Sequence, residues 1–165
     1  MTYSIVYSSQ TGNTRMLAEA IKETLAEKDI VYFGEPCQEA LKADFIFAGF
    51  WTDKGYCCEE TGEFLKKLGS NKLFLFGTAG FGISEDYFSK IIERTKERVP
   101  QSAELKGSFM CQGKMPLSVR ERYVNMKNSG APIPNIDKMI ENFDSALSHP
   151  DEADLNSLRE KIKAL

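Results

Sequence analysis

The sequence predicts an α/β protein in which helices cover both faces of a doubly wound, five-stranded parallel sheet. Short apolar runs alternate with amphipathic stretches of helical period along most of the chain. The runs at 44–50 and 71–80 are apolar almost throughout, as in strands that are buried on both faces of a sheet. The 165 residues, 42% of them hydrophobic, suffice for one core, so residues 1–165 are expected to form a single domain.

Three strands are expected in the first fifty residues. They are apolar runs rich in aromatic and β-branched residues, at 2–8, 30–34 and 44–50. The connector at 35–43 is expected to hold one turn of helix. Between the first two strands, residues 14–28 have helical period. One face of that helix carries Met16, Leu17, Ala20, Ile21, Thr24 and Leu25.

The alternation continues through residue 113. The fourth strand, with its loop, is expected at 71–80 and the fifth at 107–113. Helices are expected at 59–68 and 84–99. Ser84 is a good N-cap for the second of these helices, because acidic residues fill its first turn and basic residues its last.

The chain after residue 113 is less regular. Helices are expected at 115–126, 136–148 and 151–165, with a loop at 129–135. His149 precedes a proline between the last two helices and is expected to be a boundary residue. It has no cluster of ligand-type partners in the sequence, so no metal site is expected there.

Composition narrows the possible partners and setting. The formal net charge is −3 without a clustered basic face, so nucleic acid is not an expected partner. No apolar run approaches the ~20 residues of a membrane span, and no cleavable signal follows Met1, so no membrane role is expected. The cysteines have irregular spacing and predict free thiols in a reducing, cytoplasmic setting. They are Cys37, Cys57, Cys58 and Cys111.

Four loops are expected to share one edge of the sheet, because doubly wound sheets bind ligands beyond the carboxyl ends of their strands. These loops are 9–14, 51–58, 78–84 and 111–116. The first of them belongs to the stretch SSQTGNTR, which passes from a strand directly into a helix.

The loop at 9–14 has the properties of a phosphate site. The start of a helix offers unpaired N–H groups and a partial positive charge, which bind phosphate without a cationic side chain. Gly12 permits close backbone approach, while Ser9, Thr11, Asn13 and Thr14 add donors. The alternative is an ordinary strand-to-helix turn with a threonine cap.

Other phosphate motifs are excluded by what this loop lacks. A Walker loop requires a lysine that is missing, since Arg15 is wrongly placed. A dinucleotide fingerprint requires G-x-G-x-x-G after the first strand, and GTAGFG at 77–82 has the wrong spacing and position. A receiver domain requires an acidic cluster and a cysteine phosphatase a nucleophilic cysteine, and neither is present here.

The motif S-Q-T-G-N-T after the first strand resembles the phosphate loop of the flavodoxin family, whose members bind FMN non-covalently. The resemblance covers roughly residues 2–113 and implies the strand order 2-1-3-4-5. It places Ser9, Gln10, Thr11, Gly12, Asn13 and Thr14 around the FMN phosphate.

The same resemblance implies that the loops after the third and fourth strands hold the flavin ring. The residues concerned are Trp51, Thr52, Asp53, Lys54, Gly55, Thr78, Ala79, Gly80, Phe81 and Gly82. Trp51 and Phe81 are the expected stacking residues; the alternative for Trp51 is that it completes the core over the third strand. A peptide at 53–55 is expected to turn a carbonyl toward flavin N5, since glycine tolerates positive φ.

Three functions remain open from the sequence. The first is an FMN electron carrier that works between a reductase and an acceptor enzyme, which the absence of a dinucleotide motif or second domain favours. The second is a small FMN-dependent NAD(P)H oxidoreductase that reduces a quinone or similar acceptor. The third is an interaction module that has lost the cofactor. The segment at 115–135 is longer than a minimal flavodoxin requires, which suggests a docking element, a lid or a dimer interface.

Six acidic residues are expected to form a collar around the flavin edge. They lie in loops or first helical turns, where they also complement helix dipoles. They are Asp53, Glu59, Glu60, Glu63, Glu85 and Asp86.

Overall fold

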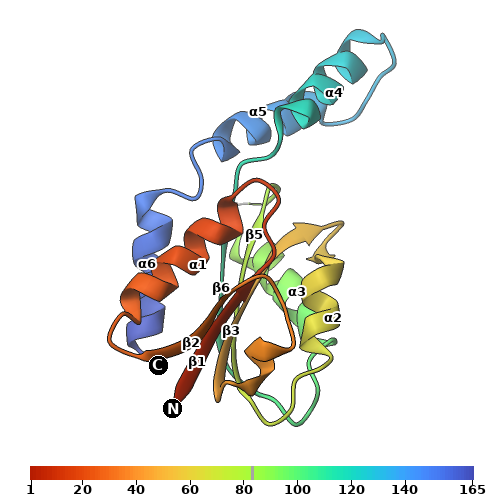
Figure 1. The fold of residues 1–165 in the computed structure, drawn as a ribbon. Coiled ribbons are helices and arrows are strands. Elements are labelled where there is room, and N and C mark those ends of the chain that lie inside the picture. The colour runs from red at the N-terminus through yellow and green to blue at the C-terminus, as the bar shows by residue number, and fades with distance from the viewer. Residues whose placement is uncertain (83) are drawn as a thin grey trace.

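A computed structural model describes residues 1–82 and 84–165, and Ile83, in the predicted loop at 78–84, lies outside the described residues. Five parallel strands form the sheet in the order β2-β1-β3-β5-β6 (Figure 1). A further short strand, β4, pairs only with the end of β3, so the five parallel strands have the predicted 2-1-3-4-5 order. The strands are β1 (Thr2–Tyr7), β2 (Asp29–Gly34), β3 (Phe45–Asp53), β4 (Tyr56–Cys57), β5 (Lys72–Ala79) and β6 (Glu104–Gln112).

Each predicted helix is present, with ends that differ by a few residues. The first ends at Thr24 rather than at residue 28, because β2 already begins at Asp29. The predicted cap is confirmed: Ser84 Oγ accepts a hydrogen bond from the N–H of Tyr87 at 3.2 Å. None of the helices in the described part of the chain combines the length and apolar character needed to cross a bilayer. The helices are α1 (Asn13–Thr24), the 3-10 helix η1 (Glu39–Lys42), α2 (Glu59–Leu65), α3 (Glu85–Lys96), α4 (Leu117–Asn128), α5 (Ile136–Ala146) and α6 (Glu152–Lys163).

The sheet separates two hydrophobic cores. Successive side chains of β3 point to opposite faces, so Ile46 and Phe50 pack in one core while Phe47 packs in the other. The first core is closed by α2 and α3, and the second by α1 and α6. Each fully buried phenylalanine stabilises the fold by about 1.5–3 kcal/mol. Apolar side chains on both faces are therefore what makes this strand a central one.

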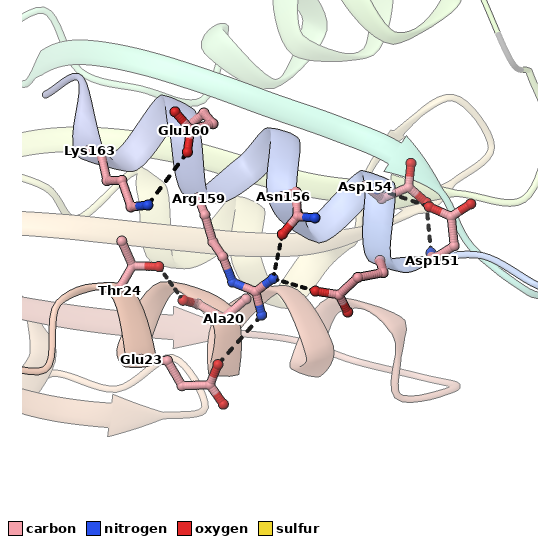
Figure 2. A network of polar contacts seen from close by, with 10 residues as sticks. Ala20, Glu23, Thr24, Asp151, Asp154, Asn156, Arg159, Glu160 and Lys163 are labelled. Atoms are coloured by element: carbon pink, nitrogen blue, oxygen red, sulfur yellow. Dashed lines mark hydrogen bonds and ion pairs between the residues drawn. The ribbon is translucent and has the colours of Figure 1, made fainter.

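The last helix packs against the first through an arginine. Arg159 in α6 donates to Glu152 at 2.7 Å and to Asn156 at 2.9 Å, and lies 3.6 Å from Glu23 in α1 (Figure 2). Only about a quarter of the Arg159 side chain is exposed. The contact fixes the C-terminal helix beside the helix that begins at the predicted phosphate loop.

Two strands extend beyond their predicted bounds. The sequence placed the end of the third strand at residue 50, but β3 continues to Asp53. It also placed the start of the fifth at residue 107, whereas β6 begins at Glu104, which pairs with Lys72. Two of the three extra residues of β6, Glu104 and Lys106, are charged, as an edge strand permits, so this part of the strand shows no apolar run.

Helices α4 and α5 form an antiparallel pair that projects beyond the carboxyl edge of the sheet (Figure 1). Arg120 and Lys127 in α4 pair with Asp144 and Asp137 in α5, at 2.8 and 2.6 Å. We refer to residues 117–146 as the α4–α5 arm. The arm lies beside the predicted cofactor loops, so its residues can contact the site.

Candidate functional site

The three predicted cofactor loops follow three adjacent strands. β1 pairs with β3, and β3 pairs with β5, all in parallel, so their carboxyl ends meet at one edge (Figure 1). The loop at 9–14 follows β1, a turn at 54–55 follows β3, and residues 80–82 follow β5. The structure therefore brings these three segments together.

The loop at 9–14 presents free backbone donors at the start of α1. The N–H groups of residues 10–14 have no acceptor among the described residues. Gly12 has a φ of 88°, which glycine adopts without strain, and a Cβ there would meet no atom within 4 Å. The side chains of Ser9 and Gln10 are exposed. Together with the partial positive charge of the helix, this arrangement suits an anion.

Two predicted phosphate ligands share an acceptor from a distant segment. Thr11 Oγ1 and Asn13 Nδ2 both donate to the backbone carbonyl of Lys114, at 3.2 and 2.8 Å. Asn13 is buried, and its Oδ1 has no hydrogen-bond partner within the described chain. The segment after β6 therefore closes one side of the loop, in line with the expectation that the loop at 111–116 shares this edge.

Thr14 differs from its neighbours in the loop because its side chain points into the protein. Its fully buried Oγ1 donates to the carbonyl of Phe50 at 3.2 Å and lies 3.3 Å from Thr78 Oγ1. Thr52 Oγ1 in turn donates to the carbonyl of Thr78 at 2.8 Å. These buried contacts tie the loop after β1 to the ends of β3 and β5.

The prediction of a loop over residues 51–58, after the third strand, is wrong, because the chain forms a tight hairpin there. Asp53 pairs with Tyr56 across a two-residue turn, in which Lys54 and Gly55 have φ values of 52° and 81°. Two consecutive positive φ values are typical of a type I′ turn, whose twist matches that of a hairpin. The Gly55 carbonyl accepts a hydrogen bond from Arg94 Nη1 at 3.2 Å, so α3 holds the turn.

Three aromatic side chains lie along the same edge. Trp51 is half-buried at the end of β3 and packs against the core under α2 and α3. Tyr56 is 49% exposed, with the Arg94 guanidinium 5.1 Å from its ring centroid. Phe81 is 40% exposed, and its ring lies 6.5 Å from that of Tyr123 in the α4–α5 arm. All three rings keep some surface accessible at the edge.

The loop after β5 is anchored by the arm. The carbonyl of Gly80 accepts hydrogen bonds from Gln112 Nε2 at 3.1 Å and from Asn142 Nδ2 in α5 at 3.0 Å. Gly82 has a φ of 75°, while Ala79 is buried at the end of the strand. The arm therefore helps to position a loop that the sequence assigned to the cofactor.

A family model for the flavodoxin domain matches residues 4–163. The chain belongs to the flavodoxin domain family. It is 42% identical over 172 residues to the flavodoxin-like domain-containing protein BilS of Clostridium symbiosum (strain WAL-14163), an alignment that covers 94% of this chain and 90% of that relative.

Solved flavodoxins share the fold. A short-chain flavodoxin associated with a non-canonical PDU bacterial microcompartment superposes with a TM-score of 0.62 at 16% identity, over 100% of this chain and 96% of the other. The flavodoxin of Fusobacterium nucleatum bound to flavin mononucleotide superposes with a TM-score of 0.52 at 18% identity, over 63% and 68% of the two chains. The predicted flavodoxin-like fold is thereby confirmed.

This flavodoxin domain has a buried polar cluster that the sequence did not reveal. Ser8 Oγ donates to Glu60 Oε2 at 2.8 Å, and Thr61 Oγ1 lies 3.2 Å from Ser8 Oγ and donates to the carbonyl of Gly49 at 2.9 Å. The cluster joins the start of α2 to the end of β1. Its only sequence signal is that Ser8 directly precedes the loop at 9–14.

The expected acidic collar is partly neutralised in the flavodoxin domain. Arg98 of the segment after α3 lies 3.5 Å from Glu59 and 3.4 Å from Glu63. Asp86 pairs with Lys90 at 3.3 Å. These exposed pairs contribute little to stability, but they lower the net negative charge that a partner meets.

The cysteines are free thiols in the structure. Burial raises the pKa of the Cys57 and Cys111 thiols, which keeps both neutral at physiological pH. Cys58 is also buried. The hydroxyl of Tyr32 lowers the pKa of Cys37, and the same contact raises the pKa of Tyr32 to about 12. Buried neutral thiols have the properties of core residues.

The expectation that His149 lacks ligand-type neighbours is wrong. Its Nδ1 lies 2.7 Å from Asp154 Oδ2 and 3.8 Å from Asp151 Oδ2. The two carboxylates have a structural reason to be there, since each accepts a hydrogen bond from the backbone N–H of the other at the start of α6. They form the capping box of that helix, and His149 packs beside it.

Proposed function

We propose that this chain is a flavodoxin-type electron carrier, which binds FMN at the carboxyl edge of its sheet and passes electrons from a reductase to an acceptor enzyme. The observation that carries the proposal is the loop at 9–14. Its backbone N–H groups lie free at the start of α1, and the space around the Gly12 Cα is open. The F. nucleatum flavodoxin, which has the same fold, is bound to FMN.

The donors of this loop fit a phosphate monoester. The backbone N–H groups and the Ser9 hydroxyl supply donors to an anion, and the Thr11 hydroxyl would join them by turning its proton from the Lys114 carbonyl to the anion. The unpartnered Asn13 Oδ1 is a buried acceptor, which suits a hydroxyl of the ribityl chain. In this assignment Thr14 supports the loop from within rather than pointing at the anion.

The neighbouring segments fit a flat heterocycle. Partly exposed aromatic side chains stack on such rings and exclude water from them. When bound, FMN supplies one-electron chemistry that the protein itself lacks. The residues that would surround the ring are Trp51, Thr52, Asp53, Lys54, Gly55, Thr78, Ala79, Gly80, Phe81 and Gly82.

Accessibility of this edge supports a carrier that works with protein partners. Tyr56 and Phe81 remain substantially exposed on either side of it. A cofactor held between them would keep one side near the surface, where a partner can approach. We place this carrier in the cytoplasm, in line with its free thiols.

The decisive experiment compares FMN with riboflavin and then tests the electron donor. Calorimetry on the apoprotein should give much tighter binding of FMN, because riboflavin lacks the phosphate. Anaerobic titration with dithionite should then show a stable one-electron reduced form, as expected of a carrier. Equal affinity for the two flavins would refute the proposed site, and rapid bleaching by NADPH alone would favour the NAD(P)H oxidoreductase.

A further inference from the structure

The outer edge of the sheet is recessed between two helices. β6 is the last strand in the sheet order, and within the described residues no strand pairs with its far side. It lies between α3 and α6 (Figure 1). A cavity of about 590 Å³ runs along this edge, and residues of all three elements line it. We refer to this cavity as the β6 groove.

Alternate residues of β6 point their backbone groups into the groove. The N–H of Gly113, directly after β6, donates to the carbonyl of Ala79 in β5 at 3.0 Å, so after the register shift of this strand pair the odd-numbered residues from 107 to 113 face β5. Backbone direction alternates along a strand, and the outward residues are therefore Ser108, Met110 and Gln112. They span about 13 Å, at roughly 3.3 Å per residue.

Most of these outward groups lack a partner. Lys161 Nζ of α6 donates to the carbonyl of Ser108 at 3.1 Å. The backbone N–H and C=O groups of Met110 and Gln112 have no hydrogen bond from the described residues. The side chain of Gln112, only 3% exposed, also lines the groove, and its Oε1 has no donor. Buried groups of this kind cost free energy unless something bonds to them.

The groove has opposite charges at its two ends. Glu85 and Asp154 lie in the first turns of α3 and α6, beside the carboxyl end of β6. Lys96 and Lys161 lie in the last turns of these helices, beside its amino end. Lys96 is paired with Glu93 at 2.6 Å, which leaves Lys161 as the cation without a carboxylate partner in the described structure.

We propose that the β6 groove binds an extended segment of a protein partner, which adds to β6 as an antiparallel strand. Main-chain hydrogen bonds to Met110 and Gln112 supply the affinity. We choose antiparallel pairing because it is the more stable kind. In this direction the start of the segment lies near Glu85 and its end near Lys161, so a basic residue near the start and an acidic residue near the end would complement the groove. A second folded copy fits less well, because its own α3 and α6 would meet these helices before the strands could pair.

The test uses a peptide of the required pattern, acetyl-Lys-Val-Thr-Val-Thr-Val-Glu-amide. The control is the same peptide with alternate backbone nitrogens methylated, so that it cannot donate to β6. Both are titrated into the ¹⁵N-labelled full chain without cofactor, so the result does not depend on FMN. We expect saturable shifts of the Met110 and Gln112 amides with the first peptide alone. No saturation, or equal shifts with both peptides, would overturn the proposal.

A charge exchange tests the orientation. Lys161→Glu should weaken binding about threefold or more, and a peptide ending in Lys should recover it. Lys163→Glu is the matched control, because Lys163 lies on the same helix outside the groove and should leave binding unchanged. Equal losses in both variants would contradict the proposed register. Sedimentation showing self-association that Lys161→Glu abolishes would assign the groove to a second copy instead.

Discussion

Thr11 is the side chain at which a contact with phosphate is most directly testable. Its hydroxyl is part-exposed in the loop that holds the free N–H groups, and the proton that it donates to the Lys114 carbonyl would turn to the phosphate when FMN binds. We expect Thr11→Val to weaken FMN binding by about 1–3 kcal/mol, the cost of a lost hydrogen bond to a charged group. Riboflavin affinity should not change. Calorimetry with both flavins measures the two values.

Thr24→Val is the matched control for this variant. Thr24 lies at the other end of α1, where its hydroxyl donates to the carbonyl of Ala20. The same chemical change there should leave FMN affinity at its original value. If the two variants reduce FMN affinity equally, the effect comes from the helix and Thr11 is not a ligand.

Trp51 should report the arrival of the flavin. It is the only tryptophan and is half-buried at the end of β3, next to the turn at 54–55. A flavin stacked within van der Waals distance quenches indole emission, so adding FMN to apoprotein should lower tryptophan fluorescence in a saturable way. Unchanged emission at saturating FMN would assign Trp51 to the core alone.

For individual residues, the sequence predicted the donor-rich loop at 9–14 but not the side-chain and backbone contacts that hold the site in place. Residues 9–14 are contiguous, so their role can be inferred from local spacing and helix physics. Lys114, Asn142 and Arg94 reach the site from segments far along the chain. Contacts of that kind depend on tertiary packing, which a single sequence does not contain.

Among the elements of the site, the β3–β4 hairpin has two consecutive residues with positive φ, a conformation that most residues adopt only with strain. Gly55 has a φ of 81°, and a Cβ there would lie 2.7 Å from Arg94 Nη1. Gly55→Ala should therefore destabilise the fold by about 1 kcal/mol or more. It should also shift the first reduction potential of the bound FMN more than it shifts FMN affinity. Urea unfolding and a redox titration measure these effects.

Gly69→Ala is the control for the hairpin variant. A Cβ on Gly69 would have only an ordinary contact, 3.8 Å from Asn71 Oδ1, and its φ lies outside the left-handed region. Its unfolding free energy should stay within experimental error of the original protein. A Gly55→Ala protein as stable as this control would show that the turn tolerates a side chain.

The acidic residues of α2 should affect how a partner approaches. Glu59→Lys and Glu63→Lys reverse two exposed charges that now contact Arg98. We expect both variants to lower the association rate with a basic redox partner and to leave the FMN spectrum unchanged. Raising the ionic strength should also slow association, because exposed charges are screened within about 10 Å at 0.1 M salt. Stopped-flow rates that respond to neither change would contradict this steering.

The hairpin also shows why one element escaped prediction. The segment Asp53-Lys54-Gly55 lacks the Asn-Gly or Asp-Gly pair that marks a type I′ turn, and Lys54 adopts a positive φ that lysine seldom shows. The last two residues of β3, Thr52 and Asp53, are polar, so the end of the strand resembled a loop. Pairing with β4 and the contact with Arg94 stabilise a conformation that local preference disfavours.

At the scale of the whole molecule, the fold could be predicted because the same burial requirement applies to each central strand along the chain. Each central strand must bury both faces, so runs such as 44–50 and 71–80 are apolar almost throughout. Right-handed crossovers then leave few possible topologies. The α4–α5 arm follows no such rule, because it lies outside the layers and buries few side chains, among them Tyr123 and Phe143. Its two helices pair with each other, and contacts of Asn142 with Gly80 and of Tyr123 with Phe81 hold it beside the loop after β5.

Carboxylates with lowered pKa values make the stability of the fold sensitive to acid. Asp44 accepts hydrogen bonds from the backbone N–H and the hydroxyl of Thr2, which lower its pKa and tie the start of β1 to that of β3. The Arg120 guanidinium lowers the pKa of Asp144, and the N–H of Asp154 lowers that of Asp151. The first contact joins two strands of the sheet, the second joins the two helices of the arm, and the third caps the last helix.

A depressed pKa in the folded state fixes the direction of the pH dependence. Each of these carboxylates stabilises the fold at pH values above its unfolded pKa, about 3.9 for aspartate, and that contribution is lost as the pH falls through the lower folded value. The free energy of unfolding should therefore decrease below about pH 5. Asp44→Asn should lower the free energy of unfolding at pH 7 and lower it less toward pH 2, because protonation of the folded-state carboxylate removes the charge that these hydrogen bonds stabilise. Urea unfolding at several pH values measures this, with Asp53→Asn as the control, since the Asp53 side chain accepts no hydrogen bond from the described residues. A destabilisation by Asp44→Asn that is the same at pH 7 and pH 2 would show that the carboxylate charge has no part in holding β1 to β3.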